Sequence, residues 1–314
     1  MPRSASVRSS AAERSSTAEL QARVRRLELV ARRNAATLRS GDYVTAILGH
    51  GLVFHEARRY VAGEPARLID WNITARVGEP YVRVYQEERQ REVVLALDVS
   101  PSMHGGFQDK TKLELAVELA ATLAVSAVDA GDRLGWVTFA DRVLEAAPPG
   151  GGRGHLFRAL RALLDATVPW DRPVPLSDPR QAIHALEGQR RGGRRVVFLI
   201  SDFVDHDVPD DLRYLRARDD VALLHVYDPL ELPDGSPGRA AAVPSGADPR
   251  WPAAAPEGGR RGRFAPASAP DLASVEADLA RQAARHGVGV ASFSTAAPVA
   301  ASLTRYLHSR RGRR

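Results

Sequence analysis

The sequence predicts an α/β fold, in which a small β-rich unit precedes a doubly wound, mostly parallel sheet. From Val93 onward, short apolar runs alternate with segments of helical periodicity. The run VVLALD (93–98) is apolar at five of its six positions, as in a strand that is covered on both faces. Residues 40–92 instead combine alternating, strand-like segments with frequent glycines, which indicates a separate β-rich unit.

Two elements are expected before that unit. Residues 1–17 are small, polar and without periodicity, so we expect a disordered basic tail. Residues 18–39 are expected to form a helix, because apolar residues from Leu20 to Ala31 recur at helical spacing with arginines on the other face. The simplest interpretation is a helix packed on the body of the protein, and a helix on a membrane surface remains the alternative.

The β-rich unit at 40–92 has expected strands in YVTAIL (43–48) and YVRVYQ (81–86). The main domain is expected at 93–304. Its strands are expected at 93–98, 134–140, 195–201, 221–227 and 288–294. Its helices are expected at 110–130, 155–166, 178–187, 209–217, 271–286 and near 298–308.

Two further segments complete the expected organisation. Residues 233–270 hold eight Pro and six Gly, which favours a mobile insert in the main domain. Residues 305–314 contain five Arg and no acidic residue, which indicates a second basic tail.

Composition excludes several classes of site. The chain has no Cys, which excludes disulfides, thiolate metal sites and a cysteine nucleophile. No run approaches the roughly 18 apolar residues of a membrane span, and the N-terminus lacks the apolar centre of a secretory signal, so we expect a cytoplasmic protein. The net charge of +6 comes from the two ends of the chain, and every basic residue except Lys110 and Lys112 is Arg. This arginine bias weakens a nucleic-acid interpretation based on the isoelectric point, and no specific nucleic-acid partner is expected.

Polar side chains follow two of the expected strands, at the edge of the sheet where ligands bind in open α/β folds. Asp98, Ser100 and Ser102 follow the first strand, Asp202 follows the strand at 195–201, and Ser177 precedes the helix at 178–187. Carboxylate and hydroxyl oxygens suit Mg²⁺, which also keeps several waters. The sequence therefore predicts a site for Mg²⁺ or another divalent cation, with a position left open for a carboxylate of a partner.

Simpler interpretations of these residues stay open. A strand-end Asp followed by Ser also forms turns and helix caps, and Ser177 or Asp178 could be the cap of the next helix. We expect Asp98 to lie at a solvent-facing strand end, so that its replacement by Ala would leave the fold intact. Likewise, Trp71 is most simply a packing residue that links the β-rich unit to the sheet.

Asp98-Val99-Ser100-Pro101-Ser102, a hydroxyl before a mid-domain helix and Ile200-Ser201-Asp202 resemble the metal-ion-dependent adhesion site of von Willebrand factor A-type domains. A second set of motifs precedes this site: Ser40-Gly41-Asp42-Tyr43, Gly49-His50-Gly51, Phe54, Arg58, Tyr60, Arg67-Leu68-Ile69-Asp70-Trp71-Asn72, Thr74-Ala75-Arg76, Tyr81-Val82 and Glu87-Glu88-Arg89. A third set follows its first loop: Asp132-Arg133-Leu134-Gly135, Phe198-Leu199-Ile200-Ser201-Asp202-Phe203 and Asp228-Pro229. Through these residues the chain resembles the bacterial domain of unknown function 58 family, whose members contain a von Willebrand factor A-type domain of Rossmann-type topology.

The resemblance implies a non-catalytic, Mg²⁺-dependent protein-interaction module. Family members commonly accompany a MoxR-type AAA+ ATPase and are thought to act as adaptors or co-chaperones in the assembly or activation of other proteins. Carried over by position, Asp98, Ser100 and Ser102 match the first metal loop and Asp202 the third, whereas Ser177 falls where the family has Thr. The expected partners are therefore such an ATPase, a protein client, or both.

Two other functions are weighed against this one. The first is a metal-dependent hydrolase that uses Asp98, although the second Asp of a haloacid-dehalogenase-type nucleophile is replaced by Ser100. A serine hydrolase would need a Gly-x-Ser-x-Gly elbow, which is missing around Ser102 and Ser201. The second is a nucleic-acid binder that works through the Arg-rich tails, whose affinity would fall steeply with salt.

Overall fold

A six-stranded sheet forms the centre of the computed structural model, which describes residues 5–38, 52–62, 64–87, 91–106, 110–166, 177–190, 193–203, 208–229 and 272–311. The strand order is β5-β4-β3-β6-β7-β8, and every neighbouring pair is parallel except β4 and β5. The strands are β3 (Glu92–Asp98), β4 (Arg133–Phe139), β5 (Val143–Gly150), β6 (Arg195–Ser201), β7 (Asp220–Tyr227) and β8 (Gly289–Ser294). The predicted fold class, a doubly wound and mostly parallel sheet, is therefore confirmed.

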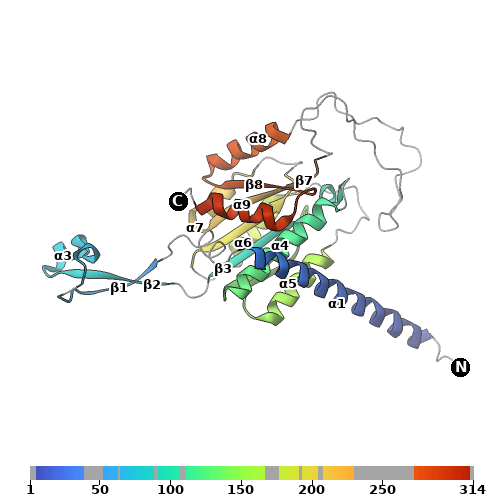
Figure 1. The fold of residues 1–314 in the computed structure, drawn as a ribbon, viewed down its shortest axis with the longest axis horizontal. Helices are drawn as coiled ribbons and strands as arrows, with labels where there is room; N and C mark the ends of the chain where they lie inside the picture. The colour runs from blue at the N-terminus through green and yellow to red at the C-terminus, as the bar shows by residue number, and fades with distance from the viewer. Residues whose placement is uncertain are drawn as a thin grey trace.

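Helices cover both faces of this sheet (Figure 1). One face is covered by α1 (Ala5–Thr37), α4 (Lys112–Asp129), α5 (Arg153–Asp165) and α9 (Val299–Arg311). The other face is covered by α6 (Pro179–Gly188), α7 (Leu212–Arg218) and α8 (Leu272–Arg285). In β3 the side chains of Val93, Leu95 and Leu97 belong to the first core and those of Val94 and Ala96 to the second. Because successive strand residues point to opposite faces, the apolar run at 93–97 supplies both cores.

The direction in which strands are added reverses at β3. The chain runs from β3 to β4 and β5 on one side, and then returns to β6, β7 and β8 on the other. In open α/β sheets the loops leave a crevice at the carboxyl ends of the strands on either side of such a reversal. Here those ends carry Asp98 of β3 and, directly after β6, Asp202.

The β-rich unit is a hairpin with a short helix. Strand β1 (Leu52–Arg59) pairs antiparallel with β2 (Tyr81–Glu87), and the 3₁₀ turn η1 (Ala66–Leu68) and helix α3 (Trp71–Val77) lie between them. Asp70 caps α3 by accepting hydrogen bonds from the backbone of Asn72 and Ile73. Figure 1 shows the hairpin extending away from the six-stranded sheet. The expected strand at 43–48 and the insert at 233–270 lie outside the described residues.

Trp71 does not link this unit to the sheet, so that interpretation is wrong. Its side chain is 68% exposed, and α3 contains no buried residue. Val61, Leu68 and Val77 are also exposed. The physical reason is that α3 lies on a hairpin that projects from the body, where the sheet offers no surface to pack against.

The ends of the described chain are more ordered than expected. Helix α1 includes residues 5–17, which contain neither Pro nor Gly to interrupt it, so the disordered tail expected at 1–17 is wrong over residues 5–17. Helix α9 continues to Arg311, and the basic tail expected at 305–314 is wrong up to that residue. Leu307 of α9 is fully buried, and Arg310 forms an ion pair of 2.6 Å with Asp220.

Strand β5 is absent from the sequence-based expectations. It contains Pro148 and Pro149 and pairs antiparallel with β4 alone, at one edge of the sheet. Proline lacks the N–H that an interior strand needs, but an edge strand tolerates it. The two prolines therefore argue against a strand in the sequence, although a strand that contains them is tolerated at this edge position.

Two tryptophans provide a direct test of the projecting hairpin. We expect Trp71→Ala to change the free energy of unfolding by less than about 0.5 kcal/mol, because the side chain is exposed. Trp136→Ala is the matched control, and it is expected to cost about 3–5 kcal/mol because Trp136 is 2% exposed in the main core. Urea denaturation measures both values, and a comparable loss for the two variants would contradict the placement of α3.

Candidate metal centre

Asp98, at the carboxyl end of β3, accepts three hydrogen bonds through its carboxylate. Its Oδ1 accepts a hydrogen bond of 2.8 Å from the backbone N–H of Ser100. Its Oδ2 accepts the hydroxyl of Ser177 at 2.7 Å and that of Ser201 at 2.6 Å. Burial and the charge of Asp202 raise the pKa of Asp98, and the three hydrogen bonds oppose that shift only in part.

The expectation that Asp98 faces solvent is wrong, since its side chain is 0% exposed. The loop after β3, the last residue of β6 and the segment before α6 each supply one hydrogen-bond donor to its carboxylate. Their three donors replace the water that a carboxylate at an open strand end would bind. Asp98 is therefore a structural group of the site as well as a candidate ligand.

A second carboxylate stands beside this network. Asp202 Oδ1 accepts the hydroxyl of Ser102 at 3.2 Å, and the Ser102 and Ser100 hydroxyls lie 3.1 Å apart. The ammonium of Lys112, the first residue of α4, donates to Asp202 Oδ2 at 2.8 Å. The side chains of Lys112 and Asp202 are each 3% exposed, so this ion pair is almost completely buried.

The structure thus brings all five predicted residues into one hydrogen-bonded cluster, to which it adds Ser201 and Lys112. The cap interpretation of Ser177 does not hold, because Asp178 caps α6 and the Ser177 hydroxyl is directed to Asp98. Asp98 does form the predicted turn, because its Oδ1 accepts a hydrogen bond from the backbone N–H of Ser100. Ser201 could have been predicted from the sequence, because it directly precedes Asp202 at the same strand end. Lys112 could not, because it lies 90 residues from Asp202 in the chain.

The backbone after Asp202 is held in an uncommon conformation. Phe203 has a φ of 48°, in the left-handed region that a bulky residue rarely adopts. Its N–H donates to the Ser201 hydroxyl at 3.0 Å, and the same hydroxyl donates to Asp98. Ser201 therefore holds both this turn and the carboxylate of Asp98. Such strain persists where the surrounding structure enforces it, here through the hydrogen bond to Ser201.

His225 of β7 lies close to the cluster and is buried. Its ring stacks on Tyr227 with 5.6 Å between centroids, and its Nδ1 lies 3.2 Å from the Ser292 hydroxyl. Burial lowers the pKa of His225 to about 4, with Lys112 adding to the shift and Asp202 opposing it. The imidazole is therefore neutral at neutral pH and adds no charge to the site.

The donor set fits a hard divalent cation. Two carboxylates and three hydroxyls offer only oxygen atoms, which are the ligands that Mg²⁺ prefers. Softer metals prefer nitrogen or sulfur ligands. The residues that would hold the ion are Asp98, Ser100, Ser102, Ser177 and Asp202. No group of three or more His, Asp or Glu side chains is arranged to hold a metal in the described part of the chain, and this cluster combines two carboxylates with hydroxyls instead.

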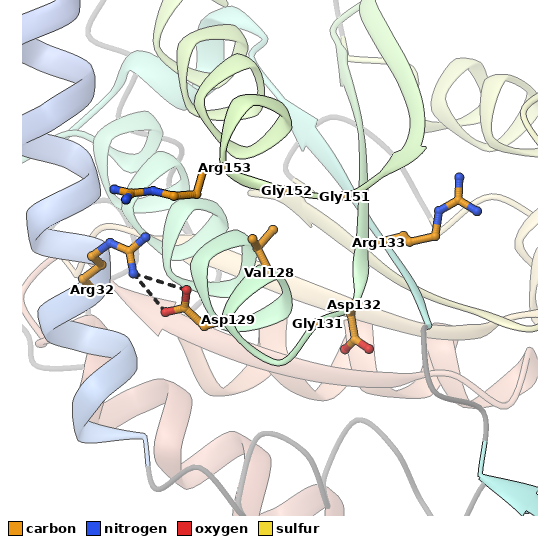
Figure 2. Close-up of a pocket in the computed structure, with 9 residues that line it drawn as sticks. All are labelled: Arg32, Val128, Asp129, Gly131, Asp132, Arg133, Gly151, Gly152 and Arg153. Carbon is orange, nitrogen blue, oxygen red and sulfur yellow. Dashed lines mark hydrogen bonds and ion pairs between the residues drawn. The ribbon is translucent and has the colours of Figure 1, made fainter.

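A separate cavity lies far from this cluster. It measures about 830 Å³ and is lined by residues of α1, α4 and α5 and by the segment that leads into β4 (Figure 2). Arg32 and Asp129 point toward one another across it, with a contact of 3.1 Å, and Arg153 lies alongside. Because Arg133 marks the amino end of β4, the cavity lies at the edge of the sheet opposite to Asp98.

Comparison with known proteins gives a family match that includes most of the hairpin and all of the cluster. A family model described as "Protein of unknown function DUF58" matches residues 56–240. The uncharacterized protein Rv1480 of Mycobacterium tuberculosis is 34% identical over 220 residues, which is 69% of this chain and 68% of that protein.

Solved structures are similar at lower identity. An aerotolerance-related membrane protein from Bacteroides fragilis, with multiple mutations to serines, is 19% identical and covers 71% of this chain and 100% of its own, with a TM-score of 0.48. The SpRpn10 VWA domain is 12% identical and covers 69% of this chain and 95% of its own, with a TM-score of 0.37.

Removal of the central carboxylate should destabilise the protein. We expect Asp98→Ala to lower the free energy of unfolding by about 3 kcal/mol, because three buried donors lose their acceptor. Ser102→Ala is the control and should cost less than about 1 kcal/mol, since it removes one hydroxyl from a partly exposed position. Urea denaturation in EDTA compares the two, and an unaffected Asp98→Ala variant would contradict the network.

His225 should make the protein sensitive to acid. Its pKa is about 4 in the folded protein and 6.5 for an unperturbed histidine, so between these values the unfolded chain binds a proton that the folded chain does not. Stability then falls as the pH is lowered, by about 2 kcal/mol from this residue between pH 7 and pH 5. Urea denaturation in EDTA should show a smaller loss over this range for His225→Phe, and an identical loss would refute the assignment.

Proposed function

The chain belongs to the family described as protein of unknown function DUF58, as its sequence predicts, and from that premise we propose that it is a divalent-cation-dependent protein-interaction module. The proposed partner is a MoxR-type AAA+ ATPase, for which the protein would act as an adaptor or co-chaperone toward a client. Among the described residues, no helix has the length and apolar character needed to cross a bilayer. The cytoplasmic location is part of the proposal.

The observation that carries this proposal is the convergence of Asp98, Asp202 and three hydroxyls at the point where the strand order reverses. When bound there, Mg²⁺ would supply an electrophilic centre that accepts a carboxylate from a partner. Asp98 and Asp202 would provide the negative charge that holds it. Ser100, Ser102 and Ser177 would contribute neutral oxygens, which leave the cation incompletely neutralised.

The geometry supports a binding role better than the hydrolase alternative. A nucleophilic carboxylate must reach the substrate, whereas Asp98 is fully buried and both of its oxygens accept hydrogen bonds. The nucleic-acid alternative also loses support, because Arg310 of the expected basic tail is engaged with Asp220. A protein partner at the loops around Asp202 remains the interpretation that uses the whole cluster.

The proposal is tested by capture of partners from native lysate with the tagged, full-length protein. We expect a MoxR-type ATPase or its client to be recovered with Mg²⁺, and recovery to fall at least tenfold with EDTA. Asp202→Asn should cause a similar loss, because it keeps the shape of the side chain and removes its charge. Mass spectrometry identifies and quantifies the captured proteins.

Asp228→Asn is the matched control. Asp228 is also a buried aspartate at the carboxyl end of a strand, but its Oδ2 accepts the Thr295 hydroxyl at 2.9 Å, outside the cluster. Capture by this variant should equal that of the wild type. Equal capture by folded Asp202→Asn, or capture that EDTA leaves unchanged, would overturn the metal-dependent mechanism.

A further inference from the structure

Lys112 places a positive charge inside the candidate metal centre. Its ammonium lies 2.8 Å from Asp202 Oδ2, and the two side chains are each 3% exposed. A buried carboxylate needs a compensating charge, which Lys112 supplies to Asp202. The proposed divalent cation would have to bind the same carboxylate, so it would meet the ammonium at close range and be repelled by it.

The position of Lys112 in α4 indicates that its charge serves Asp202. Lys112 is the first residue of the helix, where the helix dipole disfavours a positive side chain. The start of the helix is fixed independently by a capping box between Thr111 and Glu114. The Lys112 ammonium can therefore leave Asp202, and a cation can replace it, by movement of the Lys112 side chain without unwinding of α4.

The residue type also matters. All but two of the 44 basic residues of the chain are Arg, yet the one at this position is Lys. Lysine carries a compact charge on a flexible stem, whereas the planar guanidinium of arginine binds both oxygens of a carboxylate as a rigid fork. The ammonium is about the size of a small ion and can move away from the carboxylate on its flexible stem. These properties suit an ion pair that a metal ion replaces.

We propose that Lys112 is an internal counter-ion that competes with the divalent cation for Asp202. When no cation is bound, its ammonium balances the charge of Asp202 through the ion pair. Binding of the cation displaces the ammonium from Asp202, so Lys112 lowers the affinity of the site for metal. This inference rests on the proposed metal-dependent function and assigns to Lys112 the regulation of that site.

Calorimetric titration of the full-length protein with Mg²⁺ tests the competition. Lys112→Met preserves the length of the side chain and removes its charge, and we expect it to bind Mg²⁺ at least tenfold more tightly than the wild type. Lys110→Met is the matched control, because Lys110 pairs with Glu118 at 3.0 Å and not with Asp202. It should bind Mg²⁺ within twofold of the wild type.

A second measurement uses the wild-type protein and so does not depend on how well a variant folds. With only two lysines, protein labelled with ¹³C-lysine gives two sets of side-chain signals, and Lys110→Met assigns them. Added Mg²⁺ should shift the Lys112 signal and leave that of Lys110 unchanged. Asp202→Asn should abolish the Mg²⁺-dependent shift.

The outcomes separate this inference from the proposed function. If the wild type binds Mg²⁺ and Lys112→Met binds it equally, or the Lys112 signal does not respond, the competition is overturned and the metal site stands. If neither the wild type nor folded Lys112→Met binds millimolar Mg²⁺, the metal site and the competition both fail. Tighter binding by Lys112→Met, with a Lys112-specific shift in the wild type, supports the proposal.

Discussion

The hydrogen bonds to the carboxylate of Asp98 are the constraint on which the rest of the site depends. They join the end of β3 to Ser177 before α6 and to Ser201 at the end of β6. Ser201 in turn accepts from the backbone of Phe203, so the turn that carries Asp202 is tied to the same carboxylate. Because a buried carboxylate is costly without such donors, the hydrogen bonds that stabilise Asp98 also hold the candidate ligands together.

The two ends of β6 use buried charge in different ways. At the amino end, Arg195 binds Asp219 through its backbone N–H and its guanidinium, with a shortest contact of 2.7 Å, and both side chains are almost fully buried. This rigid, multiply bonded pair suits a permanent structural role. At the carboxyl end, the flexible ammonium of Lys112 meets Asp202. The chemistry of the two pairs thus separates a fixed end of the sheet from an end suited to ligand exchange.

The projecting hairpin has the opposite character to the cluster. Polar groups are buried around Asp98, whereas Trp71, Val61 and Val77 expose apolar surface on the hairpin. The family match begins within β1, at residue 56, and extends beyond β7, so it includes both features. The protein therefore combines a polar interior site with an apolar projection on one chain.

The sequence by itself determined the alternation of strands and helices and the residues that converge at the carboxyl edge. Strand β6 has the predicted bounds, because a wholly apolar run between polar residues reports burial on both faces. Asp98 and Asp202 converge because parallel strands end at the same edge, which is a property of topology and needs no side-chain detail.

Only the tertiary structure decided how those residues are surrounded. The burial of Asp98, the exposure of Trp71 and the entry of Lys112 into the site depend on how loops and helices far apart in the chain pack together. Periodicity is a local property that reports which face of an element is apolar. Whether a polar side chain meets water or a buried counter-charge depends on residues that no local pattern contains.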